Sequence, residues 1–403
     1  MKKTKMEKGI TLIALMITIV VLLILAVVAI NAITKDDILG RAEDATKKYN
    51  QAVEKEQETM EKYEEYLDKI TGKKVSEVQN NLISKTENTT VYDEYGNKIV
   101  VPAGFKIVVN EDTNNADIVT KGIVIEDCTE AETKGSQFVW VPVGKIYTDT
   151  ARTEANAKTI TLGRYENFTA TDGVYTPKQI ATAENCNETV VVKSLFQEEI
   201  SGGRHNAKAR NLEAFITSAT TKCGYYIGRY EARTNNTTVR TSEADELTTV
   251  TCIKTNVVYN YVTQPQASSL SREMYSDGYK TDGTGTFSSD LINSYAWDTA
   301  IVFLQTFDNR SEEKKTTPYS TQTSLNQDFL STGTTEDIIC NIYDMASNCE
   351  EWTTEASFKW IEGGMNVNAP YVARRTSLRY WYSGEAYLEV PVQSFRTILY
   401  VGV

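Results

Sequence analysis

Histidine is almost absent from this sequence: its 403 residues include only His205, which excludes a metal site built from several histidines. Basic residues are too few for a nucleic-acid partner, because the net charge is −12. Neither a Gly-x-Ser-x-Gly motif nor a Cys-x-x-Cys spacing occurs. The chain therefore lacks the sequence signs of a nucleophile elbow, a zinc ribbon or a thioredoxin-like redox pair.

The start of the chain combines a basic leader with a long apolar run. Four lysines precede Gly9, and the 24 residues from Ile10 to Ile33 contain no charged side chain. A helix of this length measures about 36 Å, which exceeds the roughly 30 Å of bilayer hydrocarbon. We therefore expect residues 10–33 to form a transmembrane helix with its lysine-rich flank in the cytoplasm.

Gly9 lies before the apolar run, whereas the cleavage site of a secretory signal follows it. The segment from Lys8 to Ala14 resembles the processing site of type IV prepilins and pseudopilins. The resemblance implies that a prepilin peptidase removes residues 1–9 and that the new first residue, Ile10, is methylated. Ala14 stands where the family usually has glutamate, which is compatible with a minor or tip subunit. A simple N-terminal membrane anchor is the alternative interpretation.

A second helical pattern follows the apolar run. Residues 34–37 have the form of a helix start, and Thr71-Gly72 supplies a helix end. Between them, apolar residues recur at steps of three and four with charged residues in the gaps. The pattern predicts one helix over residues 10–71, with residues 10–33 in the membrane or filament core and residues 34–71 amphipathic. A short coiled coil above an ordinary anchor would show the same stripe.

Beyond residue 71 the pattern changes. Residues 72–90 are polar and are expected to form a linker. Residues 98–109 and 122–126 contain short apolar runs with turn residues around them, which predicts strands. Residues 146–210 are rich in Thr, Asn and Glu with little periodicity, which predicts loops or an insertion.

The six cysteines all follow the predicted anchor, at positions 128, 186, 223, 252, 340 and 349. If this part of the chain is extracellular, up to three disulfides are permitted, and the sequence does not choose among the pairings. Buried thiols are an equally fair interpretation, since a domain of this size does not need disulfides.

Four separated stretches resemble one known family. They are Gln137–Val143, Gly224–Ala232, Asn341–Thr353, and Gly363-Gly364 with Ser394-Phe395-Arg396. The series is similar to the formylglycine-generating-enzyme (sulfatase-modifying factor) family, which has a Tyr-Asp-Met-Ala-Gly-Asn-x-x-Glu-Trp-Thr segment and a terminal Gly-Phe-Arg. Residues 293–304 resemble the tryptophan-bearing helix of that family. The resemblance spans residues 91–403 and implies an α+β fold: a C-type-lectin-like domain rich in loops, which follows the long pilin-type helix.

The same resemblance argues against catalysis. Active members use a cysteine pair between the Gly-Gly and Gly-Phe-Arg landmarks, and this chain has no cysteine after Cys349. The related iron-dependent sulfoxide synthases need several histidines, and only His205 is present. We therefore expect that the domain is not an enzyme.

Calcium is the one cofactor that the resemblance implies. In the family, the Asn and Glu of the Asn-x-x-Glu-Trp segment help to coordinate Ca²⁺ with backbone carbonyls, and the matching residues are Asn348 and Glu351. Such oxygen ligands suit this hard cation. Alternatively, Asn348 and Glu351 only form hydrogen bonds within the loop while Trp352 fills the core.

Residues 366–389 form the predicted interaction surface. The stretch shows no clear helix or strand period and contains Tyr371, Arg374, Arg375, Arg379, Tyr380, Trp381, Tyr382 and Tyr387. Tyrosine, tryptophan and arginine carry much of the binding energy at protein interfaces. In lectin-like proteins diversified by retroelements, the variable positions lie in this part of the domain. The alternative is that some of these aromatics pack the domain itself.

Taken together, the sequence predicts a type IV pilus subunit, minor or tip, with a non-catalytic lectin-like head for adhesion or ligand binding. The expected partners are other pilin subunits through the N-terminal helix, the prepilin peptidase, the membrane before assembly, and an unknown surface protein or glycan. The expected location is the cell surface or pilus, with an extracellular head and an inner (cytoplasmic) membrane anchor before assembly. The alternatives are a structural minor pilin or pseudopilin with a spacer head, and a surface enzyme.

Overall fold

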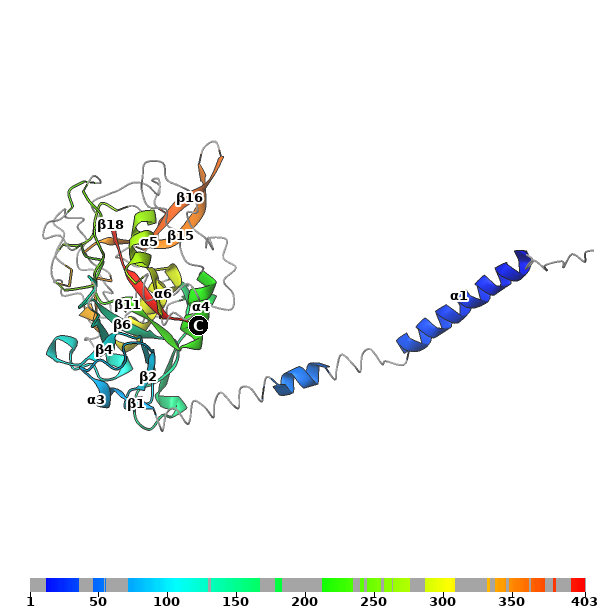
Figure 1. Ribbon diagram of the computed structural model, residues 1–403, viewed down its shortest axis with the longest axis horizontal. Helices are drawn as coiled ribbons and strands as arrows, with labels where there is room; N and C mark the ends of the chain where they lie inside the picture. The colour runs from blue at the N-terminus through cyan, green and yellow to red at the C-terminus, as the bar shows by residue number, and fades with distance from the viewer. Residues whose placement is uncertain are drawn as a thin grey trace, which may run out of the picture. The chain divides into compact units, whose positions relative to one another are not determined.

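A computed structural model describes most of the chain in two units, residues 1–71 and residues 72–403, each of which is considered by itself. The described residues are 12–35, 46–53, 55, 72–129, 132–166, 178–182, 212–234, 240–242, 245–254, 257–262, 264–275, 287–308, 332–333, 338–345, 348–361, 364–373, 380–381 and 393–402. Figure 1 shows the elements in chain order, from blue to red.

The first unit contains helix α1, Leu12–Lys35, and a further helical stretch at residues 46–53. The predicted helix over residues 10–71 is thus described only in these parts. Eleven large apolar side chains of α1, between Met16 and Val28, are each 48% to 62% exposed. Because these residues follow one another almost without interruption, they cover every side of the helix.

The expected membrane anchor needs correction. Among the described residues, no helix combines the length and the hydropathy required to cross a membrane. The side chains described in α1 run from Met16 to Val28, about 20 Å of helix, which is less than the roughly 30 Å of bilayer hydrocarbon. The predicted inner-membrane anchoring, and the cell-surface location built on it, are therefore not supported.

The second unit is a mixed α/β domain built on a six-stranded antiparallel sheet of order β12-β19-β11-β6-β5-β4. Its strands are β4 (Phe105–Val108), β5 (Val124–Asp127), β6 (Gln137–Pro142), β11 (Gly224–Gly228), β12 (Phe287–Leu291) and β19 (Thr397–Val401). Strands β4 and β5 lie in the regions where the apolar runs predict strands. Neighbours in this sheet are distant in the sequence: Trp140 pairs with Tyr226, and Tyr226 pairs with Leu399.

Helices α4 (Leu212–Thr221), α5 (Gln264–Glu273) and α6 (Ser294–Phe307) pack around this sheet (Figure 1). The side chain of Asn293 caps α6 by accepting a hydrogen bond from the backbone N–H of Ala296 at 2.9 Å. The buried face of α6 includes Trp297 and Phe303. The predicted tryptophan-bearing helix over residues 293–304 is therefore present, and it extends to Phe307.

Smaller sheets surround the main one. The three-stranded sheet consists of β1 (Lys73–Lys74), β2 (Thr89–Tyr92) and β3 (Lys98–Val101), and two-stranded sheets join β7 (Gly144–Tyr147) to β8 (Ala157–Ile160), β9 (Gly163–Glu166) to β10 (Lys178–Thr182), and β13 (Ile338–Ile339) to β14 (Ile342–Tyr343). The four-stranded sheet has the order β17 (Tyr380–Trp381), β16 (Gly364–Ala373), β15 (Glu350–Ile361) and β18 (Gln393–Phe395). Short helical turns occur at α3 (Val75–Val78), η1 (Glu111–Thr113), η2 (Val119–Lys121) and η3 (Glu154–Asn156).

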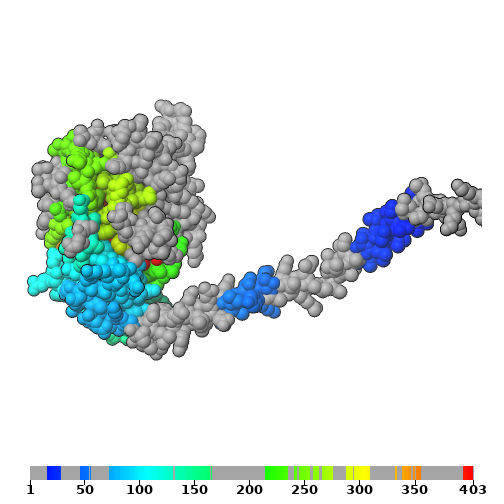
Figure 2. Space-filling view, viewed as in Figure 1, coloured from blue at the N-terminus to red at the C-terminus, as the bar shows by residue number. Residues whose placement is uncertain are grey.

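Two regions differ from the sequence-based expectation. The polar segment 72–90, expected to be a linker, contains β1, α3 and the start of β2, and Val75 in α3 is buried. One buried valine is enough to fix so short a turn to the domain, and it leaves no periodic signal. In the space-filling view, the part of the domain from residue 72 to about residue 129, in light blue and cyan, forms a continuous surface (Figure 2). Within residues 146–210, expected to be loops, the strands β8, β9 and β10 form.

Aromatic side chains fill the core of the sheet. Trp140 and Tyr226 face each other across β6 and β11 with ring centroids 4.9 Å apart. Gly224 is required beside them, because a Cβ at this position would lie 2.3 Å from the Trp140 ring. Phe105 contacts the rings of Phe138 and Phe287 at 6.2 and 5.5 Å. Such edge-on pairs stabilise the sheet beyond their buried area.

Candidate functional site

The predicted site residues lie in three different situations. Gly9 and Ile10 lie outside the described residues, as do Arg374, Arg375, Arg379, Tyr382 and Tyr387. Tyr371 lies in β16, and Tyr380 and Trp381 form β17. These two strands are antiparallel, with Tyr371 paired to Trp381. The structure thus brings three of the eight predicted interaction residues together at one pair of strands.

Asn348 and Glu351, the predicted calcium ligands, are both buried and both hydrogen-bonded to protein groups. Glu351 accepts from Arg396 Nε through Oε1 at 2.8 Å and from Trp297 Nε1 through Oε2 at 3.2 Å. Asn348 donates through Nδ2 to Glu231. Among the described residues, no group of three or more His, Cys, Asp or Glu side chains could hold a metal ion. Calcium binding by this pair stays a prediction, and the contacts of both side chains are those of the hydrogen-bonding alternative.

Arg396 is the centre of this buried cluster, which we call the Arg396 centre (Arg396, Glu351, Glu231, Asp344 and Asn348). Its guanidinium is fully buried, pairs with Glu351 at 2.8 Å, and donates to the carbonyl oxygens of Gly228 and Tyr343 at 2.8 and 2.9 Å. These bonds connect the last strand of the chain to the loops after β11 and β14. A buried ion pair of this kind needs such additional hydrogen bonds to offset its desolvation.

The Arg396 centre contains more acid than base. Burial raises the pKa of the Glu231 carboxyl well above its ordinary value, and the negative charges of Asp344 and Glu351 add to the effect. Burial also raises the pKa of Glu351, although the Arg396 charge and hydrogen bond oppose the rise. Glu231 is held in place by two donors, Asn348 Nδ2 and the backbone N–H of Cys349, the latter at 2.9 Å. The sequence pattern gave no sign of Glu231 or Asp344 as partners of this site.

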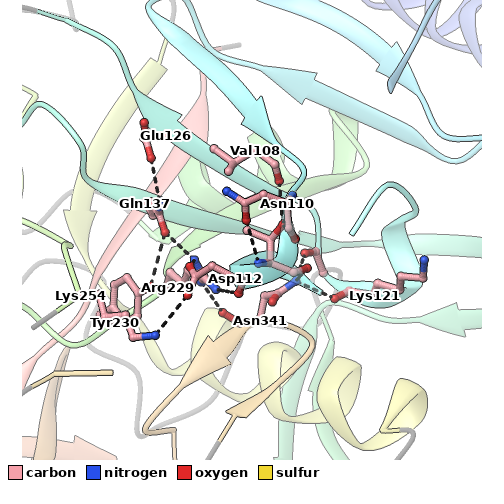
Figure 3. A network of polar contacts seen from close by, with 12 residues as sticks. Val108, Asn110, Asp112, Lys121, Glu126, Gln137, Arg229, Tyr230, Lys254 and Asn341 are labelled. Carbon is pink, nitrogen blue, oxygen red and sulfur yellow. Dashed lines mark hydrogen bonds and ion pairs between the residues drawn. The ribbon is translucent and has the colours of Figure 1, made fainter. Parts of the chain in front are cut away.

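A second buried arginine, Arg229, organises the cluster drawn in Figure 3. Its NH1 donates to Asp112 Oδ2 at 2.9 Å and to Gln137 Oε1 at 2.6 Å, and its NH2 donates to the Asp112 carbonyl at 2.7 Å. The guanidinium also lies over the rings of Tyr230 and Tyr343, at 5.3 and 5.4 Å. Such a planar fork satisfies several acceptors at once, which a lysine could not do. Arg229 stands in the second family-like stretch, which is the only signal in the sequence for it.

The Arg229 cluster is open to solvent on one side. Asp112 is 46% exposed and also contacts Lys254 Nζ at 3.2 Å, and Lys254 is 41% exposed. Partial burial raises the pKa of Asp112, but the charge of Arg229 and then that of Lys254 outweigh this and hold the pKa below its ordinary value.

Arg229 also supports an unusual turn between β13 and β14. Its Nε donates to the carbonyl of Asn341 at 3.3 Å (Figure 3). The register pairs Ile339 with Ile342, which leaves Cys340 and Asn341 as a two-residue turn. Both have positive φ, 43° and 63°, as a type I′ turn requires. Asparagine tolerates this conformation, but cysteine rarely adopts it, so the turn carries backbone strain at Cys340.

The tip of this turn fits closely against residues 113–122. Asn341 Nδ2 donates to the carbonyl oxygens of Thr113, Lys121 and Gly122, at 3.0, 3.2 and 2.9 Å. A Cβ on Gly122 would lie only 1.9 Å from the carbonyl oxygen of Cys340, so only glycine fits there. These contacts hold the strained turn in one position.

A cavity of about 550 Å³ adjoins the turn. Its described lining includes Cys340 and Asn341, the apolar side chains of Ile118, Phe307 and Ile338, and the residue Lys121. The volume is within the range of small-molecule sites in proteins. Cys340 is partly exposed, and neither it nor the other described cysteines (Cys128, Cys223, Cys252 and Cys349) forms a disulfide. The buried-thiol alternative therefore describes Cys252 and Cys349, while Cys186 lies outside the described residues.

In comparisons with protein-family models, with curated proteins and with solved structures, the chain has no significant match. The geometry of the chain itself must therefore carry any functional conclusion.

Proposed function

We propose that this chain is a subunit of a type IV pilus-like filament, minor or tip, with a non-catalytic head for adhesion or ligand binding. The observation that supports it best is the apolar surface of α1, exposed on every side between Met16 and Val28. A single partner helix covers only one stripe of such a surface. Several neighbouring copies of the helix, as in a filament core, would cover all of it.

The energetic argument favours assembly through this helix. Full burial of one large aliphatic side chain contributes about 1.5–3 kcal/mol, and α1 offers eleven large apolar side chains that are about half exposed. An isolated helix gains nothing from this surface in water. The prepilin-like segment at Gly9 and Ile10 adds a route by which a peptidase would prepare the helix for assembly.

The lectin-like fold of the head belongs to this proposal. It is supported by the way the family-like stretches meet: β6 and β11 pair in the main sheet, and Arg396 pairs with Glu351. A binding role rather than catalysis is supported by the sequence, which has no cysteine after Cys349 and a single histidine.

The test of the filament role is mass spectrometry of fibres sheared from producing cells. We expect the N-terminal peptide to begin at a methylated Ile10, and a Gly9→Leu variant to stay uncleaved and absent from the fibres. Gly40→Leu, a glycine substitution away from the processing site, is the matched control and should be cleaved normally. Uncleaved wild-type chain, or its absence from every fibre fraction, would overturn the filament role.

The test of the binding role is a triple variant, Tyr380→Ala, Trp381→Ala and Tyr382→Ala. We expect fibres that carry it to assemble normally but to lose binding to an array of surface proteins and glycans that the wild type recognises. If assembly fails while the thermal melting of the head is unchanged, the head is a structural spacer. Turnover of cysteine-containing peptides by the purified protein with copper would show an enzyme instead.

A further inference from the structure

The cavity beside the Cys340–Asn341 turn has the chemistry of a site for an uncharged ligand. No acidic side chain occurs among its described lining residues. The ammonium of Lys121, at its edge, is paired with Asp117 at 3.0 Å. A charged ligand would find no opposite charge that is not already paired at this surface.

One acceptor in the wall of this cavity is unsatisfied. Asn341 is 1% exposed, and its Oδ1 has no hydrogen-bond partner among the described residues, whereas its Nδ2 donates to three carbonyl oxygens. An unsatisfied buried acceptor costs about 1–3 kcal/mol, so a ligand N–H that reached it would gain more than in water. The amide cannot turn round to solve this, because its nitrogen is fixed by the three carbonyls.

The remaining walls favour a branched alkyl group. Ile118, Ile338 and Ile339 contribute aliphatic surface, and Phe307 contributes one aromatic ring. An aliphatic side chain that enters such a surface gains by area burial. A main-chain amide next to an aliphatic side chain is the arrangement that every Leu, Ile or Val residue of a peptide presents.

We propose that this cavity binds a peptide segment, with one branched aliphatic side chain against Ile118 and Ile338 and the neighbouring amide N–H donated to Asn341 Oδ1. The Cys340 thiol, which lies in the wall beside it, is covered when the segment is bound. The inference deepens the binding role proposed for the head and does not use the filament role. The Arg229 cluster supports the site from behind, since it fixes the carbonyl of Asn341.

The Cys340 thiol provides a local test in the full-length chain. Its rate of alkylation by N-ethylmaleimide is followed by peptide mass spectrometry, with and without N-acetyl-leucine N′-methylamide as the probe. At about ten times the dissociation constant of the probe, the rate at Cys340 should fall about tenfold. Cys128 and Cys223 are partly exposed thiols that do not line the cavity, and their rates should not change.

Two further arms separate the chemistry of the site from its fold. N-acetyl-glycine N′-methylamide, which has the amides but no alkyl group, should protect Cys340 far less. Ile338→Asn should abolish protection by the leucine probe, while Leu82→Asn, another partly exposed aliphatic position, should leave it intact. Thermal melting of both variants establishes that each is folded.

Three outcomes would overturn the inference. They are no protection at any soluble probe concentration, equal slowing of all three cysteines, and stronger protection by N-acetylglucosamine, which would assign the cavity to a glycan. If fibres with a methylated Ile10 form while Cys340 is never protected, only this inference fails and the filament role stands. Protection of Cys340 in a chain that forms no fibres would have the opposite meaning.

Discussion

The head contains two fully buried arginines, and their surroundings differ. Arg396 faces one paired carboxylate, Glu351, with Glu231 and Asp344 close by, all of them buried. Arg229 faces Asp112, which is 46% exposed, together with carbonyl oxygens and two tyrosine rings. The Arg396 centre is therefore closed, and the Arg229 cluster opens to solvent.

This difference separates a structural role from a site that a ligand can reach. The Arg396 centre connects the last strand of the chain to the loops after β11 and β14, and its polar groups already bind one another. The Arg229 cluster instead holds a strained turn at the edge of a cavity. Strain persists where the surroundings fix it, and it is concentrated at functional sites. We therefore expect stability to depend mainly on Arg396, and the state of Cys340 to depend on Arg229.

The largest effect is expected for Arg396→Met. The variant leaves Glu351 as an uncompensated buried charge, which should lower the free energy of unfolding by about 3–5 kcal/mol. Urea denaturation measures this, with Arg152→Met, an exposed arginine, as the matched control at about 0.5 kcal/mol or less. The double variant Arg396→Met with Glu351→Gln should recover part of the loss. Equal losses at Arg396 and Arg152 would contradict the closed, structural role.

Arg229→Lys should have the next largest effect, about 2–3 kcal/mol, because an ammonium cannot replace the bonds to Asp112, Gln137 and Asn341 together. The same variant should accelerate the alkylation of Cys340, since the turn loses its support. Arg396→Lys is the comparison: under conditions where it remains folded, the rate at Cys340 should stay that of the wild type. An unchanged rate in Arg229→Lys would separate the turn from the arginine cluster.

The sequence predicted the parts of this domain that leave a local pattern. The apolar runs around residues 98–109 predicted strands, and Asn293 marked the start of α6. The buried acids and the cavity leave no such pattern, because Glu231 meets Asn348 and Asp112 meets Arg229 only after distant segments pack. A polar residue in a strand-like context has the same local sequence whether it lies in the core or in solvent.

The sequence was less reliable where a short apolar contact decides the structure. Residues 72–90 look like a linker by composition, yet one buried residue, Val75, attaches them to the domain. The turn at Cys340 is a further example, because cysteine is not a residue that normally signals a left-handed turn. The stretch 341–353 was recognised by its resemblance, and the structure gives Asn348 and Glu351 hydrogen-bond partners that a pattern cannot supply.

Glu231→Gln tests the acid excess of the Arg396 centre through its pH dependence. The pKa of Glu231 is raised on folding, so the folded state holds this proton more tightly than the unfolded state does. The unfavourable contribution of Glu231 is therefore absent below its ordinary pKa of 4.5 and increases as the pH rises towards the folded-state pKa. Asp344, Glu351 and Arg396 are the charged groups that act on it, and the variant leaves them in place.

Glutamine keeps an acceptor for the Cys349 N–H and carries no charge. The variant should thus gain stability relative to the wild type as the pH increases from 5 to 8, measured by urea denaturation at each pH. A difference that does not change with pH would show that Glu231 titrates alike in the folded and unfolded states. A difference of the opposite sign would mean that the folded state favours its charged form.

Asp112→Asn should have the smallest effect, because Asp112 is half exposed and its ion pairs are weakened by solvent. We expect a loss of about 0.5–1 kcal/mol at neutral pH and low salt, decreasing as salt is added. The pKa of Asp112 is lowered on folding, so its contribution is present above the ordinary pKa and disappears as the pH falls through the folded-state pKa. The wild type and the variant should therefore converge in acid. This is the reverse of the trend at Glu231, and two curves of the same sign would mean that the open and closed arginine clusters do not differ in their electrostatics.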